Sequence, residues 1–509
     1  TGWSPDVWEE TALSSFIAGR QEPLPAEANH TRTAACTFFP VAAADCRGRL
    51  NGMYDVVIIG GGPGGYVCAI RAAQHGLSVA LVEKDKLGGT CLNRGCIPTK
   101  ALTHTAEVID SARRASEFGL VIPEAGVDFP RVMSKKDRVV ARLRGGVNLL
   151  LKRGKIDVVS GVGTLRGTRE VEVEAADGSV SRLEARNIVI ATGSEPVTPR
   201  IFGYDGVNVL ISEDVLKLSA LPKSFLIIGA GVIGCEFASI FRTFGSEVTL
   251  VDIMPNILPM VDDDVADVVR RSFKKRGINI HTGTKIASVN IADGQVEATT
   301  EDGSIFKAEK AILSIGRRPS TGGVGASDVG VKVGSFGEII VDSKMRTNVP
   351  GIWAIGDVTN KAQLAHVASA QGLAVAGNIA GEKHDMEYFA VPNCIFTSPE
   401  VASVGVSERG AREAEIEYEV GKFPFVASGK AMAMGETDGF VKVIADGSRR
   451  VIGGQIVGPH ASDLIAELAL AVSKQLTLDD IAGTIHAHPT LAEAVCEAAE
   501  AAMGRAIHI

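Results

Sequence analysis

Two cysteines, Cys91 and Cys96, stand five residues apart in a short run that is rich in glycine. In a regular helix, residues five apart point about 140° apart and rise about 7.5 Å, so a disulfide could not join them there. Gly88 and Gly89 before the pair and Pro98 after it instead indicate an irregular helix start, where the sulfurs can approach and a thiolate is stabilised. The pair therefore suits redox chemistry. Half of a zinc site or two buried thiols are the alternatives, although no second Cys or His pair has zinc spacing.

A candidate general base, His488, lies near the end of the chain, with Glu493 five residues further on. A carboxylate at this spacing can orient an imidazole and raise its basicity, which is the usual partnership of a base with its orienting group. A single histidine is more often structural than catalytic, so this interpretation depends on the other residues of the site.

A glycine-rich loop follows the apolar run over 54–59. It matches G-x-G-x-x-G at Gly60, Gly62 and Gly65, and Glu83 ends the next apolar run, 23 residues after Gly60. Such glycines let the backbone approach a pyrophosphate at a helix N-terminus, while the acid accepts a hydrogen bond from a ribose hydroxyl. A structural turn is the alternative, but strand, glycines, helix and acid in register favour a dinucleotide site.

A second loop repeats this pattern at Gly229, Gly231 and Gly234, with Asp252 again 23 residues after the first glycine. An acid at this position suits a free 2′-hydroxyl and repels a 2′-phosphate, and no Arg follows closely. We therefore expect NAD rather than NADP. Two loops in one chain predict two nucleotides bound together, one as a prosthetic group and one that exchanges.

These loops require two βαβ units, with strands over 54–59, 78–82, 225–228 and 247–251 and helices over 66–75 and up to Phe244. Between the units, residues 100–155 are expected to be helical and 157–190 to form β-hairpins. Strands near 418–425 and 439–458, with helices near 461–475 and 490–503, predict a separate C-terminal domain. The predicted fold class is α/β, with two Rossmann-like dinucleotide-binding domains and a C-terminal α+β domain.

Composition limits the function classes. The 509 residues suggest several domains, and the net charge of −8 argues against a nucleic-acid partner. The one dense basic patch, from Arg270 to Arg276, is interpreted as a solvated helix face. The longest uncharged stretch, 362–381, contains several polar residues and is interpreted as a buried helix rather than a membrane span. Eight cysteines do not make a disulfide-stapled secreted chain, so we expect a soluble protein of the cytoplasm, with an organellar matrix as the alternative.

The run from Gly88 to Lys100 resembles the active-site signature of the flavoprotein pyridine nucleotide–disulfide oxidoreductases. The strings 191–194, 315–319 and 354–357 resemble further landmarks of that family, in the same order, so the resemblance covers about residues 53–509. It implies that the first loop holds FAD tightly but non-covalently and that the second binds NAD. Gly356 and Asp357 would meet the ribityl and phosphate portion of the flavin.

The resemblance also implies roles for individual residues. Cys96 would be the sulfur on the flavin side and Cys91 the interchange thiol, while Lys100 would lie against the flavin, paired with Glu236. His488 would be the catalytic base, oriented by Glu493, and no metal is expected. The cofactor-binding residues expected on this basis are Gly60, Gly62, Pro63, Gly64, Gly65, Glu83, Lys84, Gly89, Thr90, Lys100, Gly163, Thr192, Gly193, Ser194, Gly229, Gly231, Val232, Ile233, Gly234, Glu236, Asp252, Ile286, Gly316, Gly356, Asp357, Gln363, Leu364, Ala365 and His366.

The expected domain order follows from the same resemblance. An extension of unknown role over 1–52 precedes an FAD-binding domain in two parts, a NAD-binding domain and a dimerisation domain. Their expected ranges are 53–198 and 321–390 for the FAD-binding domain, 199–320 for the NAD-binding domain and 391–509 for the dimerisation domain.

The string from His486 to Ala494 resembles the acid–base segment of those family members that oxidise a dihydrolipoyl group. This implies a homodimer whose partner is the lipoyl-bearing protein of a 2-oxoacid dehydrogenase or glycine cleavage complex, with no nucleic-acid or membrane partner. A NAD-linked reductase of another small disulfide is the alternative enzyme. A non-catalytic scaffold subunit is a third hypothesis, which the intact cysteines and histidine disfavour.

Overall fold

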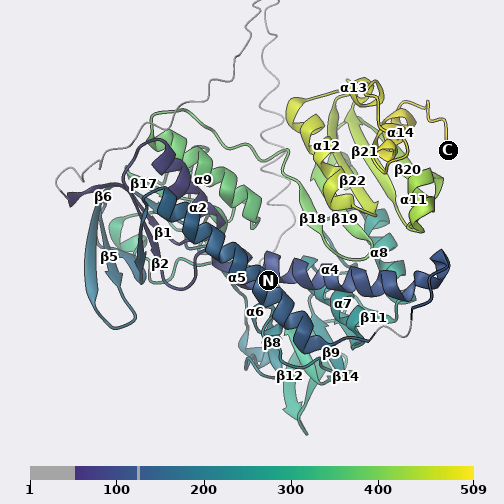
Figure 1. Cartoon of the computed structure of the whole chain (residues 1–509), viewed down its shortest axis with the longest axis horizontal. Coiled ribbons are helices and arrows are strands. Elements are labelled where there is room, and N and C mark those ends of the chain that lie inside the picture. The colour runs from purple at the N-terminus through teal and green to yellow at the C-terminus, as the bar shows by residue number, and fades with distance from the viewer. Residues whose placement is uncertain (1–51, 123–125) are drawn as a thin grey trace, which may run out of the picture.

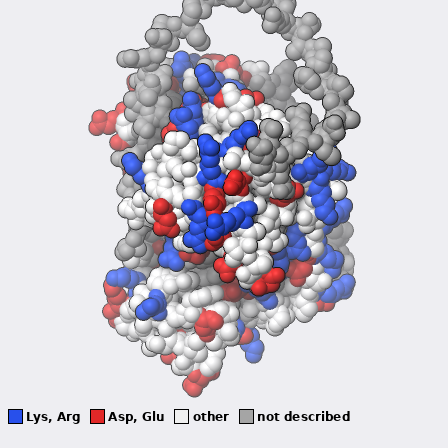
Figure 2. Space-filling view, turned by 90° about the vertical axis from the view of Figure 1, so that its left-hand side faces the viewer, with Lys and Arg blue, Asp and Glu red and all other residues white. Residues whose placement is uncertain are grey.

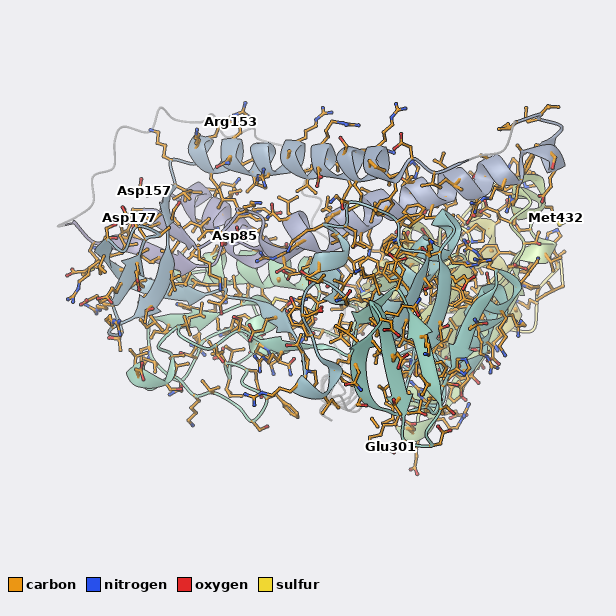
Figure 3. The ribbon with its side chains drawn as sticks, turned by 90° about the horizontal axis from the view of Figure 1, so that it is seen from below. Asp85, Arg153, Asp157, Asp177, Glu301 and Met432 are labelled. Atoms are coloured by element: carbon orange, nitrogen blue, oxygen red, sulfur yellow. The ribbon has the colours of Figure 1, made fainter. Side chains whose placement is uncertain are left out.

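The computed structural model describes residues 52–122 and 126–509, and Figure 1 shows their arrangement. The extension expected over 1–52 lies outside the described residues, except for Gly52. Figure 3 shows the long axis of the molecule, with Asp157 and Asp177 at one end and Met432 at the other.

The first dinucleotide unit begins with β1 (Tyr54–Ile59), α2 (Pro63–Gln74) and β2 (Val79–Glu83). The β1 strand runs parallel to β2 on one side and to β6 on the other, and five of its six residues are buried, as expected of a strand in a sheet that is covered on both faces. The α2 helix begins three residues earlier than the sequence predicts, because a proline fits the first helical turn without losing a hydrogen bond. The unit places its glycine loop between the end of β1 and the start of α2.

The sheet of this domain has seven strands in the order β3-β2-β1-β6-β5-β4, with β17 paired to the other side of β6. The further strands are β3 (Asp157–Ser160), β4 (Val162–Leu165), β5 (Glu170–Glu174), β6 (Val180–Ile190) and β17 (Ile352–Ala354). The antiparallel β4-β5-β6 ribbon confirms the expected hairpins for this part of 157–190. The expectation was wrong for β3, which runs parallel to β2 at the edge of the sheet. Its outer face carries ion pairs such as Arg182–Glu170, and Figure 2 shows basic and acidic groups interspersed on this side of the molecule.

The chain returns to the first domain through β17, η5 (Gly356–Thr359) and α9 (Ala365–Ile379). The α9 helix packs closely on α2, since a Cβ at Gly372 would lie 2.6 Å from the carbonyl oxygen of Gly64. The stretch 362–381 is therefore a mostly buried helix and its approach, as expected.

Three helices connect the first unit to the rest of the chain. They are α3 (Gly89–Arg94), α4 (Cys96–Arg113) and α5 (Phe129–Arg153), with η2 (Ala115–Phe118) after α4. Asp128 caps α5 by accepting a hydrogen bond from the backbone N–H of Arg131 at 3.1 Å. The predicted helical content of 100–155 is thus confirmed.

The second unit forms a parallel five-stranded sheet in the order β11-β10-β9-β15-β8. Its elements are β8 (Val209–Ile211), α6 (Ser212–Val215), β9 (Ser224–Ile228), α7 (Val232–Phe244), β10 (Glu247–Val251), α8 (Asp263–Lys275), β11 (Ile278–His281) and β15 (Lys310–Leu313). An antiparallel meander is inserted, with β12 (Ile286–Ala292), β13 (Gln295–Thr300) and β14 (Ile305–Ala308); Glu301, labelled in Figure 3, lies in its second turn. The short strands β7 (Ser194–Pro196) and β16 (Arg317–Pro319) pair where the chain enters and leaves this unit, with η3 (Arg200–Phe202) and η4 (Ser327–Val329) nearby in sequence.

One detail of the basic patch differs from the expectation. Arg276, at the C-terminus of α8, is not solvated, because its guanidinium donates to Asp110 at 2.7 Å and also contacts Thr243. The contact joins α8 to α4 and helps to hold the two nucleotide units together.

The C-terminal domain is a five-stranded antiparallel sheet in the order β18-β19-β22-β21-β20, covered by helices. Its elements are β18 (Asn393–Ile395), β19 (Glu400–Gly405), α10 (Glu408–Glu413), β20 (Tyr418–Pro424), η6 (Phe425–Ala427), α11 (Gly429–Met434), β21 (Phe440–Asp446), β22 (Val451–Gly458), α12 (Ala461–Lys474), α13 (Leu478–Ala482) and α14 (Glu493–Ala502). The α+β prediction is confirmed, although β18, β19, α10, α11 and α13 were not predicted. In the described part of the chain, no helix has the length and apolar character needed to cross a membrane.

Candidate active site

The two cysteines of the motif lie on either side of a break between α3 and α4. Gly95 forms the break with φ −141° and ψ −115°, and a Cβ there would lie 3.0 Å from the carbonyl oxygen of Thr90. The break brings Cys91 and Cys96 together, so that a hydrogen bond links their sulfurs, and both are thiols in this structure. The sequence predicted this irregular helix start, and the alternative of two separately buried thiols does not fit it.

The hydrogen bond gives the two thiols different pKa values. As the acceptor of a hydrogen bond from Cys91, and with the positive charge of Lys100 nearby, Cys96 has a pKa lowered to about 7. Cys91 donates that bond and is partly buried, so its pKa is raised well above the usual thiol range. One sulfur is thus ready to be a thiolate at neutral pH, whereas the other keeps its proton unless a base removes it.

Lys100 and Glu236 form the ion pair that the sequence suggested. The Lys100 Nζ donates to both carboxylate oxygens of Glu236, at 2.9 and 3.0 Å, and lies 4.3 Å from the centre of the Phe396 ring. Glu236 is buried and also accepts a hydrogen bond of 3.0 Å from the backbone N–H of Phe396. Because α4, α7 and the loop after β18 supply one residue each, this pair fixes three parts of the chain around the cysteines.

The first glycine loop has one position that faces open space. Gly60 has φ +109°, and a Cβ there would overlap the carbonyl oxygen of Ala191, while a Cβ at Gly65 would overlap that of Gly60. The middle glycine, Gly62, has only the Gly89 Cα near it, at 3.9 Å. The outer glycines are therefore required by the fold, and the middle one leaves room for a ligand at the N-terminus of α2.

Glu83, the acid expected to meet a ribose hydroxyl, is bonded to the first glycine loop. Its Oε2 accepts from the backbone N–H of Gly61 at 2.7 Å, and its Oε1 accepts from that of Asp85 at 2.8 Å. These bonds hold the carboxylate beside the loop, and each oxygen keeps a lone pair for a ligand.

The second loop repeats this geometry. A Cβ at Gly229 would overlap the backbone of Ser314, and one at Gly234 would overlap the carbonyl oxygen of Gly229. The middle glycine, Gly231, has no atom within 4 Å of its Cβ position. Asp252 accepts hydrogen bonds from the backbone N–H groups of Ala230 and, at 2.7 Å, of Met254. The residues present therefore fit a dinucleotide at both loops.

A buried polar network surrounds Asp357. Ser194 Oγ donates to its Oδ2 at 2.6 Å, and Arg317 Nε donates to the Ser194 hydroxyl at 2.8 Å. Burial raises the pKa of Asp357, and the hydrogen bond from Ser194 and the charge of Arg317 offset this in part. The family resemblance implied cofactor-binding roles for Ser194 and Asp357 but none for Arg317, although Arg317 lies in the string 315–319.

A second residue that sequence analysis missed is Gln371, which is fully buried on α9. Its Oε1 accepts from the backbone N–H of Gly356 at 2.6 Å, and its Nε2 donates to the Tyr388 hydroxyl at 2.9 Å. It holds the Gly356 turn that carries Asp357. A polar residue within an apolar helical stretch was the available signal.

The remaining predicted residues fall into two groups. One group lies in loops and at helix starts, where its contact with a nucleotide stays a prediction, namely Pro63, Gly64, Lys84, Gly89, Thr90, Thr192, Gly193, Val232, Ile233, Gly316, Gln363, Leu364, Ala365 and His366. Gly163 and Ile286 differ because both are buried, Gly163 against Ile59 and Val82 and Ile286 in the core beside the meander. Any contact of these two with a nucleotide must therefore come from the backbone.

His488 and Glu493 form the expected pair on the C-terminal domain. The imidazole Nδ1 lies 2.8 Å from Glu493 Oε1, and the backbone N–H of Thr490 donates to Glu493 Oε2 at 2.8 Å. Slight burial opposes ionisation of Glu493, but these two hydrogen bonds lower its pKa, so it remains a carboxylate that orients the ring. The His488 side chain is 79% exposed, which leaves the ring accessible.

His488 does not meet the cysteines of its own chain. Figure 1 shows the start of α4, which carries Cys96, near the centre of the molecule, whereas α14 lies at the upper right on the far side of the C-terminal domain.

Within the described residues, no group of three or more His, Cys, Asp or Glu side chains could hold a metal ion.

Two glycine loops that fit dinucleotides, together with a cysteine pair, define a class of disulfide oxidoreductases that use two nucleotides. The chain belongs to the pyridine nucleotide-disulphide oxidoreductase family, whose model matches residues 54–372, and its dimerisation-domain model matches 391–499. The chain is 46% identical to a curated Chlamydia muridarum protein named dihydrolipoyl dehydrogenase, over 90% of this chain and 99% of that relative.

Solved structures agree with this assignment. LpdA from Mycobacterium tuberculosis superposes with a TM-score of 0.83 at 30% identity, covering 87% of this chain and 98% of the other. The HOCl-induced flavoprotein disulfide reductase RclA from Escherichia coli gives a TM-score of 0.79 at 28% identity, covering 88% and 99%. The predicted α/β fold class is confirmed.

Proposed function

We propose that this protein is a dihydrolipoyl dehydrogenase, which oxidises a protein-bound dihydrolipoyl group and reduces NAD+. The observation that carries the proposal is the unequal thiol pair, Cys91 and Cys96, together with a separate His488–Glu493 base. The similarity to curated relatives that bear this name, over nearly their whole length, supports it. FAD, tightly but non-covalently bound at the first loop, and NAD at the second are the cofactors.

When Cys91 and Cys96 are joined in a disulfide, the difference between their pKa values directs the thiol exchange with the substrate. One substrate thiol, deprotonated by His488, attacks the Cys91 sulfur, a substrate–Cys91 disulfide forms and Cys96 leaves as a thiolate. A low pKa makes Cys96 the better leaving group, which selects Cys91 as the sulfur attacked. The second substrate thiol then attacks the substrate sulfur, closing the lipoyl disulfide and releasing Cys91, whose high pKa lets it take up the proton.

FAD, when bound, accepts the electron pair of the reduced cysteines and passes it to NAD+. The chain's own part is to hold the groups in place. Lys100, kept in position by Glu236, places a positive charge beside the Cys96 thiolate, and Asp357 offers an acceptor at the buried end of the first site. Glu493 keeps the His488 ring in one orientation, with Nδ1 bonded, so that the other nitrogen faces the substrate.

The defining experiment measures NAD+ reduction at 340 nm by the purified flavoprotein with dihydrolipoamide as donor. We expect rapid turnover with dihydrolipoamide, and little with reduced glutathione or with NADP+. A second candidate, suggested by the likeness to RclA, is a reductase of another small disulfide. Turnover of such a disulfide with NADH, in the absence of dihydrolipoamide activity, would replace the present proposal.

The enzyme is proposed to act as a homodimer, with His488 serving the cysteine pair of the other chain. The dimerisation-domain match and the separation of His488 from Cys96 within one chain support this arrangement. Its physiological partner is proposed to be the lipoyl-bearing protein of a 2-oxoacid dehydrogenase or glycine cleavage complex. The low cysteine content suits a reducing compartment, for which the cytoplasm is proposed.

Mixing two inactive variants tests the shared site. We expect His488→Gln and Cys91→Ser homodimers to be inactive, and their mixture under subunit exchange to recover activity. Each mixed dimer then holds one site with native Cys91 from one chain and native His488 from the other, because a two-fold contact gives two equivalent sites. No recovery in proven heterodimers would place both residues in the site of a single chain.

A further inference from the structure

A second histidine on the segment that carries His488 is unused by the chemistry described above. His486 lies two residues before His488, yet its side chain is only 8% exposed, whereas that of His488 is 79% exposed. Its Nε2 lies 2.9 Å from Glu467 Oε1 on α12, and its Nδ1 lies 2.8 Å from the carbonyl oxygen of Thr484. The two histidines therefore point to opposite environments, one toward the domain and one away from it.

Both neighbours of the His486 ring are acceptors. A hydrogen on a ring nitrogen can be donated to either acceptor, so the ring is held between the Glu467 carboxylate and the carbonyl oxygen of Thr484. Two contacts on opposite sides of the ring define its direction as well as its position.

The segment around His488 has few other attachments. In the described part of the chain, residues 485–490 form no backbone-to-backbone hydrogen bond, and Ile485 is 97% exposed. Side chains hold the segment instead. Thr484 bonds to the end of α13, His486 bonds to α12, and His488 and Thr490 bond to Glu493 at the start of α14.

We propose that His486, held by Glu467, is a positioning residue that fixes the backbone on the N-terminal side of His488. Glu493 alone sets the rotation of the His488 ring but does not fix where the chain bearing it runs, whereas the bond to α12 does. A displacement of about 1 Å at a reacting group can cost about 100-fold in rate. This inference rests on the proposed function, because it assigns His486 a part in the reaction of His488.

The test compares two reactions of the same holoenzyme. Turnover of dihydrolipoamide needs the cysteine pair and His488, whereas oxidation of NADH by ferricyanide needs neither. For His486→Leu and Glu467→Leu we expect kcat with dihydrolipoamide to fall by about 10- to 100-fold, and the ferricyanide rate to change by less than about threefold. Glu467→Gln, which keeps an acceptor oxygen, should retain most of the activity.

Two further readouts separate positioning from other roles. The double variant His486→Leu/Glu467→Leu should lose no more than the worse single variant, because the two residues act through one contact. The loss of kcat/KM at acid pH, which reports protonation of the base, should persist in His486→Leu and disappear in His488→Gln. The matched control is His508→Leu, which breaks another His–Glu pair of this domain, 2.6 Å from Glu497, and should leave both reactions unchanged.

Each result supports or overturns the role proposed for His486. Full dihydrolipoamide turnover in the His486 and Glu467 variants, or an equal loss in both reactions, overturns the inference, and loss of the acid limb in His486→Leu makes His486 the base instead. If His486→Leu does not fold, the two Glu467 variants carry the test. Absence of dihydrolipoamide turnover in the unaltered protein counts against the proposed function alone, and the variants are then compared with the dithiol or disulfide that the protein does turn over.

Discussion

Cys91 and Cys96 carry the same functional group, but the structure gives their thiols different pKa values. The hydrogen bond from Cys91 is the main cause of the lowered pKa of Cys96, and Lys100 adds to it. A serine at position 91 keeps a hydrogen-bond donor, whereas an alanine removes it. The two substitutions therefore separate the effect of the hydrogen bond from that of the lysine.

We expect the Cys96 thiolate to form with a midpoint near pH 7 in Cys91→Ser and at least about one pH unit higher in Cys91→Ala. The measurement is the long-wavelength absorbance that a thiolate gives beside oxidised flavin, followed against pH in the holoenzyme. Cys96→Ser is the control and should show no such band. The same midpoint in the serine and alanine variants would contradict the assigned role of the hydrogen bond.

Asp252 is a second residue whose charge we propose to set a preference, here for the nucleotide. Its carboxylate is held beside the second glycine loop by the backbone of Ala230 and Met254, and the neighbouring Ile253 is 60% exposed. Removing the charge and adding a cation next to it should admit a 2′-phosphate.

We therefore expect Asp252→Asn to reduce the preference for NAD over NADP, measured as the ratio of kcat/KM, by about tenfold, which is about 1.4 kcal/mol. Asp252→Asn with Ile253→Arg should reduce it further, because the guanidinium can pair with the phosphate. Ile253→Arg alone is the control for the added cation. An unchanged ratio in the double variant would show that the preference arises elsewhere in the site.

At the level of elements, the three glycines of each loop have different roles. The outer glycines serve the fold, because a side chain there would overlap the backbone, and the middle glycine leaves the space in which we propose that the ligand binds. Gly231 has an ordinary φ of −74° and open space at its Cβ position, so alanine fits there without strain. Gly234 has no such freedom, since its Cβ would collide with the carbonyl oxygen of Gly229.

Because of these differences, replacing glycine with alanine should affect nucleotide binding at one position and stability at the other. Gly231→Ala should leave the melting temperature unchanged and raise the KM for NAD+ by about tenfold or more, because the methyl group occupies space for the pyrophosphate. Gly234→Ala should instead lower the free energy of unfolding by about 1–3 kcal/mol. Thermal unfolding and NAD+ kinetics measure both, and unaltered NAD+ kinetics in Gly231→Ala would remove the pyrophosphate from this loop.

At the scale of the whole molecule, a buried lysine joins the second dinucleotide unit to the C-terminal domain. Lys442 on β21 is completely buried, and its Nζ donates to Asp262 and Asp264 at 2.8 Å and to Glu408 at 3.3 Å. Burial disfavours the ammonium, but the hydrogen bonds that it donates to the two aspartates raise the pKa of Lys442. Because the folded value is raised, this contribution to stability is present at neutral pH and is lost only as the pH rises above about 10.4.

Lys442→Met should destabilise the protein by about 3–5 kcal/mol, since it leaves Asp262 buried without its cation. Lys422 provides a matched control, because it also pairs with Asp264, at 2.5 Å, but is 44% exposed. Lys422→Met should cost about 1 kcal/mol or less. Denaturant unfolding measures both, and equal losses would mean that burial does not set the strength of this contact.

The sequence by itself determined the local chemistry of the molecule. The glycine loops with their acids, the interrupted helix at the cysteines and the His488–Glu493 pair each lie within about 30 residues, where turn requirements and strand and helix periods leave a readable pattern. The α/β class and the helices of the C-terminal domain follow from the same patterns. The start of α2 was misplaced, and β18 and β19 were missed, because a short buried strand differs little from any other apolar run.

The tertiary structure alone decided how distant segments meet. The Lys100–Glu236 pair spans 136 residues and was expected only from the family resemblance, and the Ser194–Asp357 contact spans 163. No partner was predicted for Lys442, Arg317 or Gln371, nor was the His486–Glu467 contact. Spacing along the chain carries no information about such contacts, because they depend on how whole sheets and helices pack. Burial then gives these polar groups their strength, since a charge removed from water must be paired where the fold places it.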